Sequence, residues 1–145
     1  MGYKTLRLLL IAALALSGSA HAAGQDRPRL QYLQFCSGCH LPDGSGSPAF
    51  GVPSMRGLLG QFLQVPGGRE FIVQVPGVMN SALSDADIAA LMNWLLPAVS
   101  APTLPAGGFR PYTAQEIGRL RTTRPADVPA ARAPLIQKID RLSAR

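Results

Sequence analysis

The sequence of 145 residues predicts an all-α fold, with one small domain followed by a helical extension. The segment beginning at Ser84, "SDADIAALMNWLL", carries apolar side chains at helical spacing, namely Ile88, Leu91, Met92, Leu95 and Leu96. The run from residue 71 to residue 75 alternates like a strand, but no second strand is available to pair with it. We therefore predict a helix in that region as well.

The first 22 residues have the three parts of a secretory signal peptide. Lys4 and Arg7 precede a short apolar run, which ends in small residues up to Ala22. The alternative, a membrane anchor, is disfavoured because the run is far shorter than the roughly 18–20 residues that a spanning helix needs. We predict cleavage after Ala22 and a mature chain that is exported to the periplasm.

The segment "CSGCH", residues 36–40, holds both cysteines of the chain and the only histidine that remains after cleavage. In an oxidising compartment the two cysteines could form a disulfide. A structural zinc site is disfavoured, because it needs four ligands and the chain offers only three. A thioredoxin-like pair would follow a strand, whereas residues 29–35 have helical spacing. A copper site built from cysteine and methionine is a further, weaker alternative.

C-x-x-C-H is the attachment motif of c-type haem, and its chemistry explains the spacing. The sulfur atoms of Cys36 and Cys39 would add to the two vinyl groups of one porphyrin. A two-residue spacer in a helical turn sets the sulfurs at the separation of these groups. His40 would then lie under the iron and bind it through an imidazole nitrogen. The sequence thus predicts one covalently attached haem c.

A sixth iron ligand must come from a methionine, because no second histidine remains. Met92 belongs to the apolar face of the Ser84 helix, which makes it a core residue. Met55 follows His40 by only fifteen residues, so its loop is expected to stay on the histidine side of the ring. Met79 lies in an irregular segment and belongs to no periodic apolar pattern. We predict that Met79 binds the iron, with loop packing as its alternative role.

These features resemble the small monohaem c-type cytochromes of the His/Met kind. The resemblance covers about residues 25–97 and rests on four features: "CSGCH" after a short helix, the loop "DGSGSP", the segment "FGVPSM", and Met79 shortly before the last core helix. It implies a small cytochrome c fold around one haem. In this family a proline carbonyl commonly accepts a hydrogen bond from the ligating histidine. Pro53 is the candidate for that role, and Pro48 is the alternative.

Two departures from the family pattern are visible. Leu41-Pro42 stands where such cytochromes often have a glycine after the histidine, so the turn that leaves the haem is expected to differ. The stretch between His40 and Met79 is also fairly short, which suggests a trimmed loop at the haem edge.

The remaining elements follow from local signals. Residues 25–41 should hold the first helix and the attachment turn, and residues 42–53 are too rich in glycine and proline for a regular element. Residues 54–65 suggest a short helix. Ser84 is a good N-cap for the last core helix, which we expect to end at Pro97 and to place Trp94 against the first helix.

Composition changes near residue 99, so we predict a cytochrome c domain at 23–99 and a basic extension at 100–145. The extension begins with a linker rich in proline and glycine. A capping box at Thr113 opens a helix through Arg121, and a second amphipathic stretch follows from Pro134. From residue 101 onward eight basic and three acidic side chains give a formal charge of +5, whereas residues 23–100 carry −1. The extension either packs on the domain or docks on an acidic redox partner or an anionic membrane surface.

We predict a periplasmic one-electron carrier rather than an enzyme, because no catalytic acid, base or nucleophile is evident. Its expected partners are a periplasmic dehydrogenase as donor and an oxidase or another cytochrome as acceptor. Nucleic acid is not an expected partner of an exported protein. Two alternatives stay open: a haem enzyme or gas-binding module with an open sixth site, and a fixed cytochrome subunit of a larger dehydrogenase.

Overall fold

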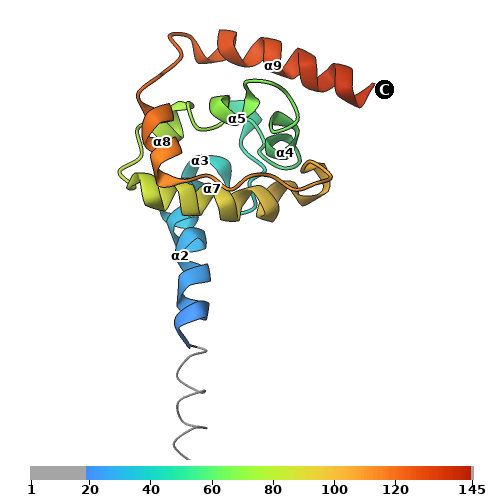
Figure 1. Cartoon of the computed structure of the whole chain (residues 1–145). Coiled ribbons are helices and arrows are strands. Elements are labelled where there is room, and N and C mark those ends of the chain that lie inside the picture. Colours follow the sequence, from blue (N-terminus) through green and yellow to red (C-terminus); the bar gives the residue numbers. More distant parts are fainter. Residues whose placement is uncertain (1–18, 145) are drawn as a thin grey trace, which may run out of the picture.

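The computed structural model describes residues 19–144, with side chains from residue 27 onward. The predicted signal peptide, residues 1–22, lies outside the described residues except for its last four. The helical segments are α2 (Ser19–Phe35), α3 (Ser37–His40), η1 (Pro48–Phe50), α4 (Leu58–Phe62), α5 (Gly68–Phe71), α6 (Pro76–Met79), α7 (Asp85–Ser100), η2 (Ala101–Thr103), α8 (Ala114–Arg121) and α9 (Val128–Ser143). Figure 1 shows their arrangement, with α2 and α9 on opposite sides of α7.

The predicted all-α fold is confirmed between residues 19 and 144. No strand occurs in this range, and one isolated antiparallel bridge joins Ser47 to Val52. No strand forms at residues 71–75, but the helix predicted there is confirmed only in part, because α5 ends at Phe71 and residues 72–75 form a turn. In the same range, none of the helices combines the length and the apolarity that crossing a membrane requires.

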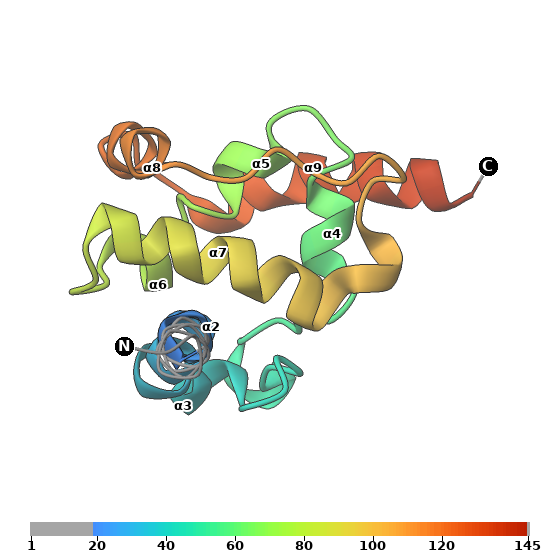
Figure 2. The ribbon, with the colours of Figure 1, turned by 60° about the horizontal axis from the view of Figure 1, so that its bottom comes forward.

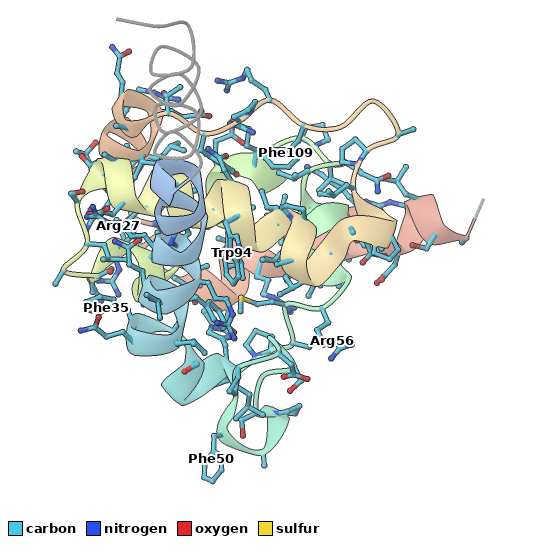
Figure 3. All side chains as sticks on the ribbon, turned by 90° about the horizontal axis from the view of Figure 1, so that it is seen from below. Arg27, Phe35, Phe50, Arg56, Trp94 and Phe109 are labelled. Carbon is cyan, nitrogen blue, oxygen red and sulfur yellow. The ribbon has the colours of Figure 1, made fainter. Side chains whose placement is uncertain are left out.

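Helices α2 and α7 lie side by side (Figure 2), and Figure 3 labels Trp94 on α7. Tyr32 of α2 is 1% exposed, and its ring centroid lies 5.9 Å from that of Trp94 in α7. An ion pair between Arg27 and Asp87 (2.8 Å) joins the same two helices nearer the start of α7. The predicted contact between Trp94 and the first helix is therefore confirmed.

Ser84 caps α7 as predicted, because its hydroxyl accepts a hydrogen bond from the amide of Asp87 (3.1 Å). The prediction that Pro97 ends this helix is wrong, since α7 continues to Ser100. A proline inside a helix removes one backbone hydrogen bond and crowds the preceding turn. The continuation therefore needs stabilising contacts from outside the helix.

Such contacts come from the segment before α4. The amide of Gly57 donates to the carbonyl of Val99 (2.9 Å), and the hydroxyl of Ser100 donates to the carbonyl of Met55 (3.0 Å). Ser100 is fully buried. The last turn of α7 is thus held by tertiary hydrogen bonds that a local proline rule cannot anticipate. Helix α4 itself is shorter than the predicted stretch of residues 54–65.

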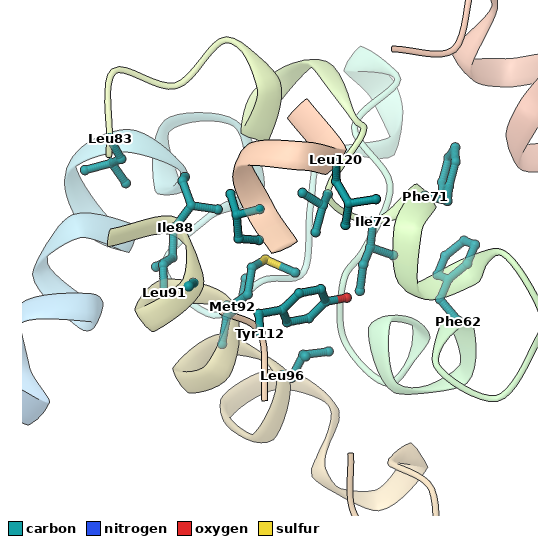
Figure 4. Close-up of a cluster of buried hydrophobic side chains, with 14 of the residues drawn as sticks. Phe62, Phe71, Ile72, Leu83, Ile88, Leu91, Met92, Leu96, Tyr112 and Leu120 are labelled. Atoms are coloured by element: carbon teal, nitrogen blue, oxygen red, sulfur yellow. The ribbon is translucent and has the colours of Figure 1, made fainter. Parts of the chain in front are cut away.

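The C-terminal extension contributes to the same hydrophobic core as α2 and α7. Its buried side chains are Tyr112, Ile117, Leu120, Leu135 and Ile139. Figure 4 shows Tyr112 and Leu120 among the core side chains around Met92. Helix α8 begins after Thr113, whose hydroxyl accepts from the amide of Glu116 (3.2 Å), as the capping box predicted. The extension is therefore packed on the rest of the chain through most of its length.

Helix α9 begins at Val128, six residues before the predicted start at Pro134. Asp127 is its N-cap, with its carboxylate accepting from the amide of Ala130 (2.9 Å), and Pro129 occupies the first turn, where proline is well tolerated. These start signals outweigh the break that Pro134 suggests. Leu135 and Ile139 then face the core, while Leu142 stays exposed.

A partly buried ion pair ties the extension to α5. The guanidinium of Arg69 donates twice to the carboxylate of Glu116 (2.8 and 2.9 Å) and lies 3.8 Å from the centre of the Tyr112 ring. Arg110 donates to the same carboxylate (2.9 Å). The hydrogen bonds from Arg69 are the main reason that the pKa of Glu116 is lowered to about 2, although burial opposes the shift.

We expect this carboxylate to contribute stability that depends on pH. The pKa of Glu116 is lower in the folded state, so its contribution is present above pH 4.5 and is lost as pH falls toward 2. The lowered pKa corresponds to about 2–3 kcal/mol. Glu116→Gln should therefore reduce the free energy of unfolding by about that amount at pH 7, and the difference should vanish near pH 2. Urea unfolding across this range measures it, with Asp140→Asn as a control at an exposed acid. A difference that is independent of pH would contradict the account.

Candidate functional site

The segment "CSGCH" forms one helical turn at the end of α2. The carbonyl of Cys36 accepts from the amides of Cys39 (3.2 Å) and His40 (3.0 Å), while the amide of Cys36 donates to the carbonyl of Tyr32 (2.9 Å). Ser37 strengthens the junction, because its hydroxyl donates to the carbonyl of Leu33 (2.7 Å). Both thiols and the imidazole are therefore carried by one backbone turn of five residues.

Both cysteines are free thiols, so the structure does not contain the alternative disulfide. Cys36 is half-buried, and burial raises the pKa of its thiol. Cys39 is exposed. Within the described residues no group of three or more His, Cys, Asp and Glu side chains could hold a metal ion, so a structural zinc site finds no support there.

His40 is half-buried and has an unusual environment. Its Nδ1 is buried and has no hydrogen-bond partner that meets normal geometry. The Pro53 carbonyl nevertheless lies close enough to the ring to raise the pKa of His40, while burial, the larger effect, lowers it. A buried imidazole nitrogen beside a carbonyl is suited to a hydrogen bond once the ring is held in place. Pro48, the alternative to Pro53, lies in the exposed helix η1.

The loop from residue 41 to residue 57 folds back on itself and carries Pro53 toward His40. Ser47 and Val52 exchange two backbone hydrogen bonds (2.9 and 3.1 Å). Gly46 donates from its amide to the carbonyl of His40 (3.0 Å), and a Cβ at this position would lie 2.5 Å from the Pro53 oxygen. Glycine is therefore required at position 46, where the chain passes between His40 and Pro53.

Leu41, the residue after His40, has a backbone conformation that is rare for a side chain. Its φ and ψ are 62° and 159°, and it is the only non-glycine residue with positive φ in the described part of the chain. This region is populated almost entirely by glycine and costs other residues about 1–3 kcal/mol. The hydroxyl of Tyr32 donates to the Leu41 carbonyl (2.6 Å), and Pro42 favours the extended ψ.

We expect glycine at position 41 to relieve this strain. Leu41→Gly should be more stable than Leu41→Ala by about 1 kcal/mol, the reverse of the usual order, because alanine keeps the Cβ that makes positive φ unfavourable. Urea unfolding of the two purified variants measures the difference. Both substitutions remove the same exposed side chain, so the comparison isolates the backbone effect. An alanine variant equal to or more stable than the glycine variant would show that Leu41 is not strained.

The three candidate methionines differ in their surroundings. Met92 is 2% exposed and belongs to the hydrophobic core, as its place in the apolar face predicted. Met55 is half-buried and packs against that core. Met79 is half-buried at the end of α6 and, among the described residues, is not one of the side chains packed on the core. Of the three candidate methionines, Met79 is thus the one whose side chain is not packed on the hydrophobic core.

A cavity of about 320 Å³ lies between α2 and α7 but is not the candidate site. Its lining includes Tyr32, Arg56 and Trp94, and it contains neither cysteine, nor His40, nor Met79. The residues that could hold a haem are therefore identified by their chemistry. Two free thiols and one imidazole on a single turn, together with the buried Nδ1 beside a carbonyl, form a donor set that fits a c-type haem.

Two contributors to the site region were not predicted from the sequence. The sequence indicates only helical spacing at residues 29–35, but the hydroxyl of Tyr32 also donates to the carbonyl of Leu41, directly after His40. The sequence shows Arg121 only as the last residue of a helix in the basic extension, yet its guanidinium donates to the carbonyl of Met79 (3.2 Å). Neither interaction has a local sequence signal, because the partners are 9 and 42 residues apart.

The chain is similar to cytochrome c4 of Pseudomonas aeruginosa, with 34% identity over 89 residues. The matched region is 58% of this chain and 43% of that protein, so the chain spans less than half the length of this curated relative. No family model matches the chain, and no solved structure matches it. The similarity to a c-type cytochrome agrees with the motif at residues 36–40.

Proposed function

We propose that this chain is an exported one-electron carrier with one covalently attached haem c. The similarity to a cytochrome c4 is the premise, and the turn at residues 36–40 carries the proposal. Cys36 and Cys39 would supply the two thioether links, and His40 would supply one axial ligand. Two free thiols and an imidazole on one helical turn are the arrangement that such an attachment requires.

Pro53 would orient the imidazole of His40. If Nδ1 carries the proton and donates it to the Pro53 carbonyl, Nε2 is left as the iron ligand. The buried, unpartnered Nδ1 and the effect of the Pro53 carbonyl on the pKa of His40 support this role. Glycine at position 46 would leave room for the Pro53 carbonyl, because any side chain there would collide with the Pro53 oxygen.

Met79 would supply the sixth ligand. Its thioether is a soft donor, and it is the methionine that lies outside the core cluster in the described residues. When bound, the haem iron supplies the redox chemistry by accepting and returning one electron, and ligation by histidine and methionine raises its potential. The protein's part is to hold both ligands and to keep the surroundings of the iron apolar.

The proposed partners are a periplasmic dehydrogenase as donor and an oxidase or another cytochrome as acceptor. Three exposed apolar side chains, Phe35, Leu41 and Phe50, lie in or next to the attachment turn and the loop that follows it (Figure 3 labels Phe35 and Phe50). They would suit a small and transient interface. Arg124 and Arg141 are exposed on the extension and would steer an acidic partner or an anionic membrane surface toward the protein.

Substitution of each methionine by leucine tests the axial pair, because leucine preserves volume but cannot bind iron. Met79→Leu should abolish the methionine–iron charge-transfer band, convert the iron from low spin to high spin, and lower the reduction potential. Met55→Leu and Met92→Leu are matched controls and should leave all three unchanged. A loss of the band in one of the controls instead would reassign the ligand. A wild-type protein that is high spin would favour the alternative function, a module with an open sixth site.

A further inference from the structure

The segment that carries Met79, residues 74–83, has little internal structure of its own. It contains only the four-residue helix α6, whose amides at Met79 and Asn80 donate to the carbonyls of Val75 and Pro76 (3.0 and 2.9 Å). The carbonyls that follow the end of a short helix have no partners within the helix and must be satisfied from elsewhere. We refer to residues 74–83 as the Met79 segment.

Arg121, at the end of α8, satisfies three of these carbonyls. Its Nη2 donates to the carbonyls of Met79 (3.2 Å) and Ser81 (2.7 Å), and its Nη1 donates to that of Leu83 (3.1 Å). The side chain is only 19% exposed, so these hydrogen bonds are largely shielded from water. One guanidinium thus holds the backbone at three alternate positions, beginning at Met79 itself.

The geometry of α8 explains how Arg121 reaches the segment. Ile117 and Leu120 are buried in the core, which fixes the helix in position. At Gly118 the helix passes so close to Asp85 that a Cβ would lie 2.8 Å from its carboxylate. Asp85 in turn accepts a hydrogen bond from Arg121 Nη1 (2.8 Å).

A second contact holds the other end of the Met79 segment. The amide group of Gln74 donates to the hydroxyl of Thr123 (2.7 Å), just beyond the end of α8. The beginning and the end of the segment are therefore both attached to the C-terminal extension. Met79 lies between Gln74 and Leu83, and its own carbonyl is one of the three that Arg121 binds.

We propose that Arg121 is a positioning residue for the binding of iron by Met79. This inference rests on the proposed function, in which Met79 is the sixth ligand. By binding the carbonyls of residues 79, 81 and 83, Arg121 favours the backbone conformation in which the thioether is presented to the iron. Loss of these bonds increases the fraction of molecules in which Met79 has left the iron.

Arginine suits this role better than lysine. Its planar group presents several donors in fixed directions, whereas an ammonium group is a single point on a flexible stem. The ion pair with Asp85 alone does not explain the arrangement, because the Asp85 side chain is 43% exposed and such pairs contribute little. The hydrogen bonds to three backbone carbonyls are the distinctive feature.

Imidazole binding to the ferric iron of the purified haem-containing protein tests this proposal. Imidazole competes with Met79, so its apparent affinity reports how firmly the methionine is held. Arg121→Gln should bind imidazole about tenfold more tightly than the wild type, and Arg121→Lys should fall between them. Arg119→Gln is the matched control, since it removes the same charge from an exposed position of α8 and should match the wild type.

The outcomes separate this proposal from the proposed function. If Arg121→Gln lowers the unfolding temperature but binds imidazole like Arg119→Gln, Arg121 is only structural and the proposal is wrong, while the axial pair stands. If Met79→Leu itself leaves imidazole affinity unchanged, Met79 is not the ligand, and both the axial pair and the role of Arg121 fail. Should Arg121→Gln not fold, Arg121→Lys decides alone, because it keeps the charge and loses the fixed donors.

Discussion

Tyr32 connects the hydrophobic core to the attachment turn, and the arrangement of the site depends on it. Its ring is buried between α2 and α7 against Trp94, and its hydroxyl donates to the carbonyl of Leu41, directly after His40. Burial raises the pKa of Tyr32 to about 12, so the hydroxyl remains a donor at any physiological pH. The packing of two helices is thereby coupled to the backbone that leaves the proposed iron ligand.

The C-terminal extension completes this framework from the other side. A domain of this size buries a modest share of its surface, so additional core residues matter to its stability. The extension supplies them through Tyr112, Ile117 and Leu120, and it also supplies polar contacts to α5 and to the Met79 segment. Its basic charge is therefore only part of its role, because Arg110 and Arg121 are engaged in ion pairs with Glu116 and Asp85.

Local signals in the sequence were sufficient where the physical cause is also local. Ser84 and Thr113 cap their helices as predicted, because an N-cap needs only its own next turn. The prediction at Pro97 failed for the opposite reason, because contacts with Met55 and Gly57 hold the end of α7. The start of α9 was predicted too late although its cap at Asp127 is itself a local signal.

The candidate site shows the same division. The turn at residues 36–40 continues the first helix, as predicted for residues 25–41, whereas the bonds from Tyr32 to Leu41 and from Arg121 to Met79 join residues with no shared local pattern. Leu41 is a special case. The departure from glycine at this position was visible in the sequence, but the positive φ that Leu41 adopts became clear only from the structure.

Covalent attachment of one haem through Cys36 and Cys39 is the central claim, and the intact mass of the protein purified from the periplasm tests it most directly. We expect the mass of the chain from Ala23 plus one haem, which acidified acetone does not extract. The variant with both Cys36→Ala and Cys39→Ala should lack this added mass. A wild-type mass equal to the polypeptide alone, obtained from cells that load other c-type cytochromes, would contradict the account.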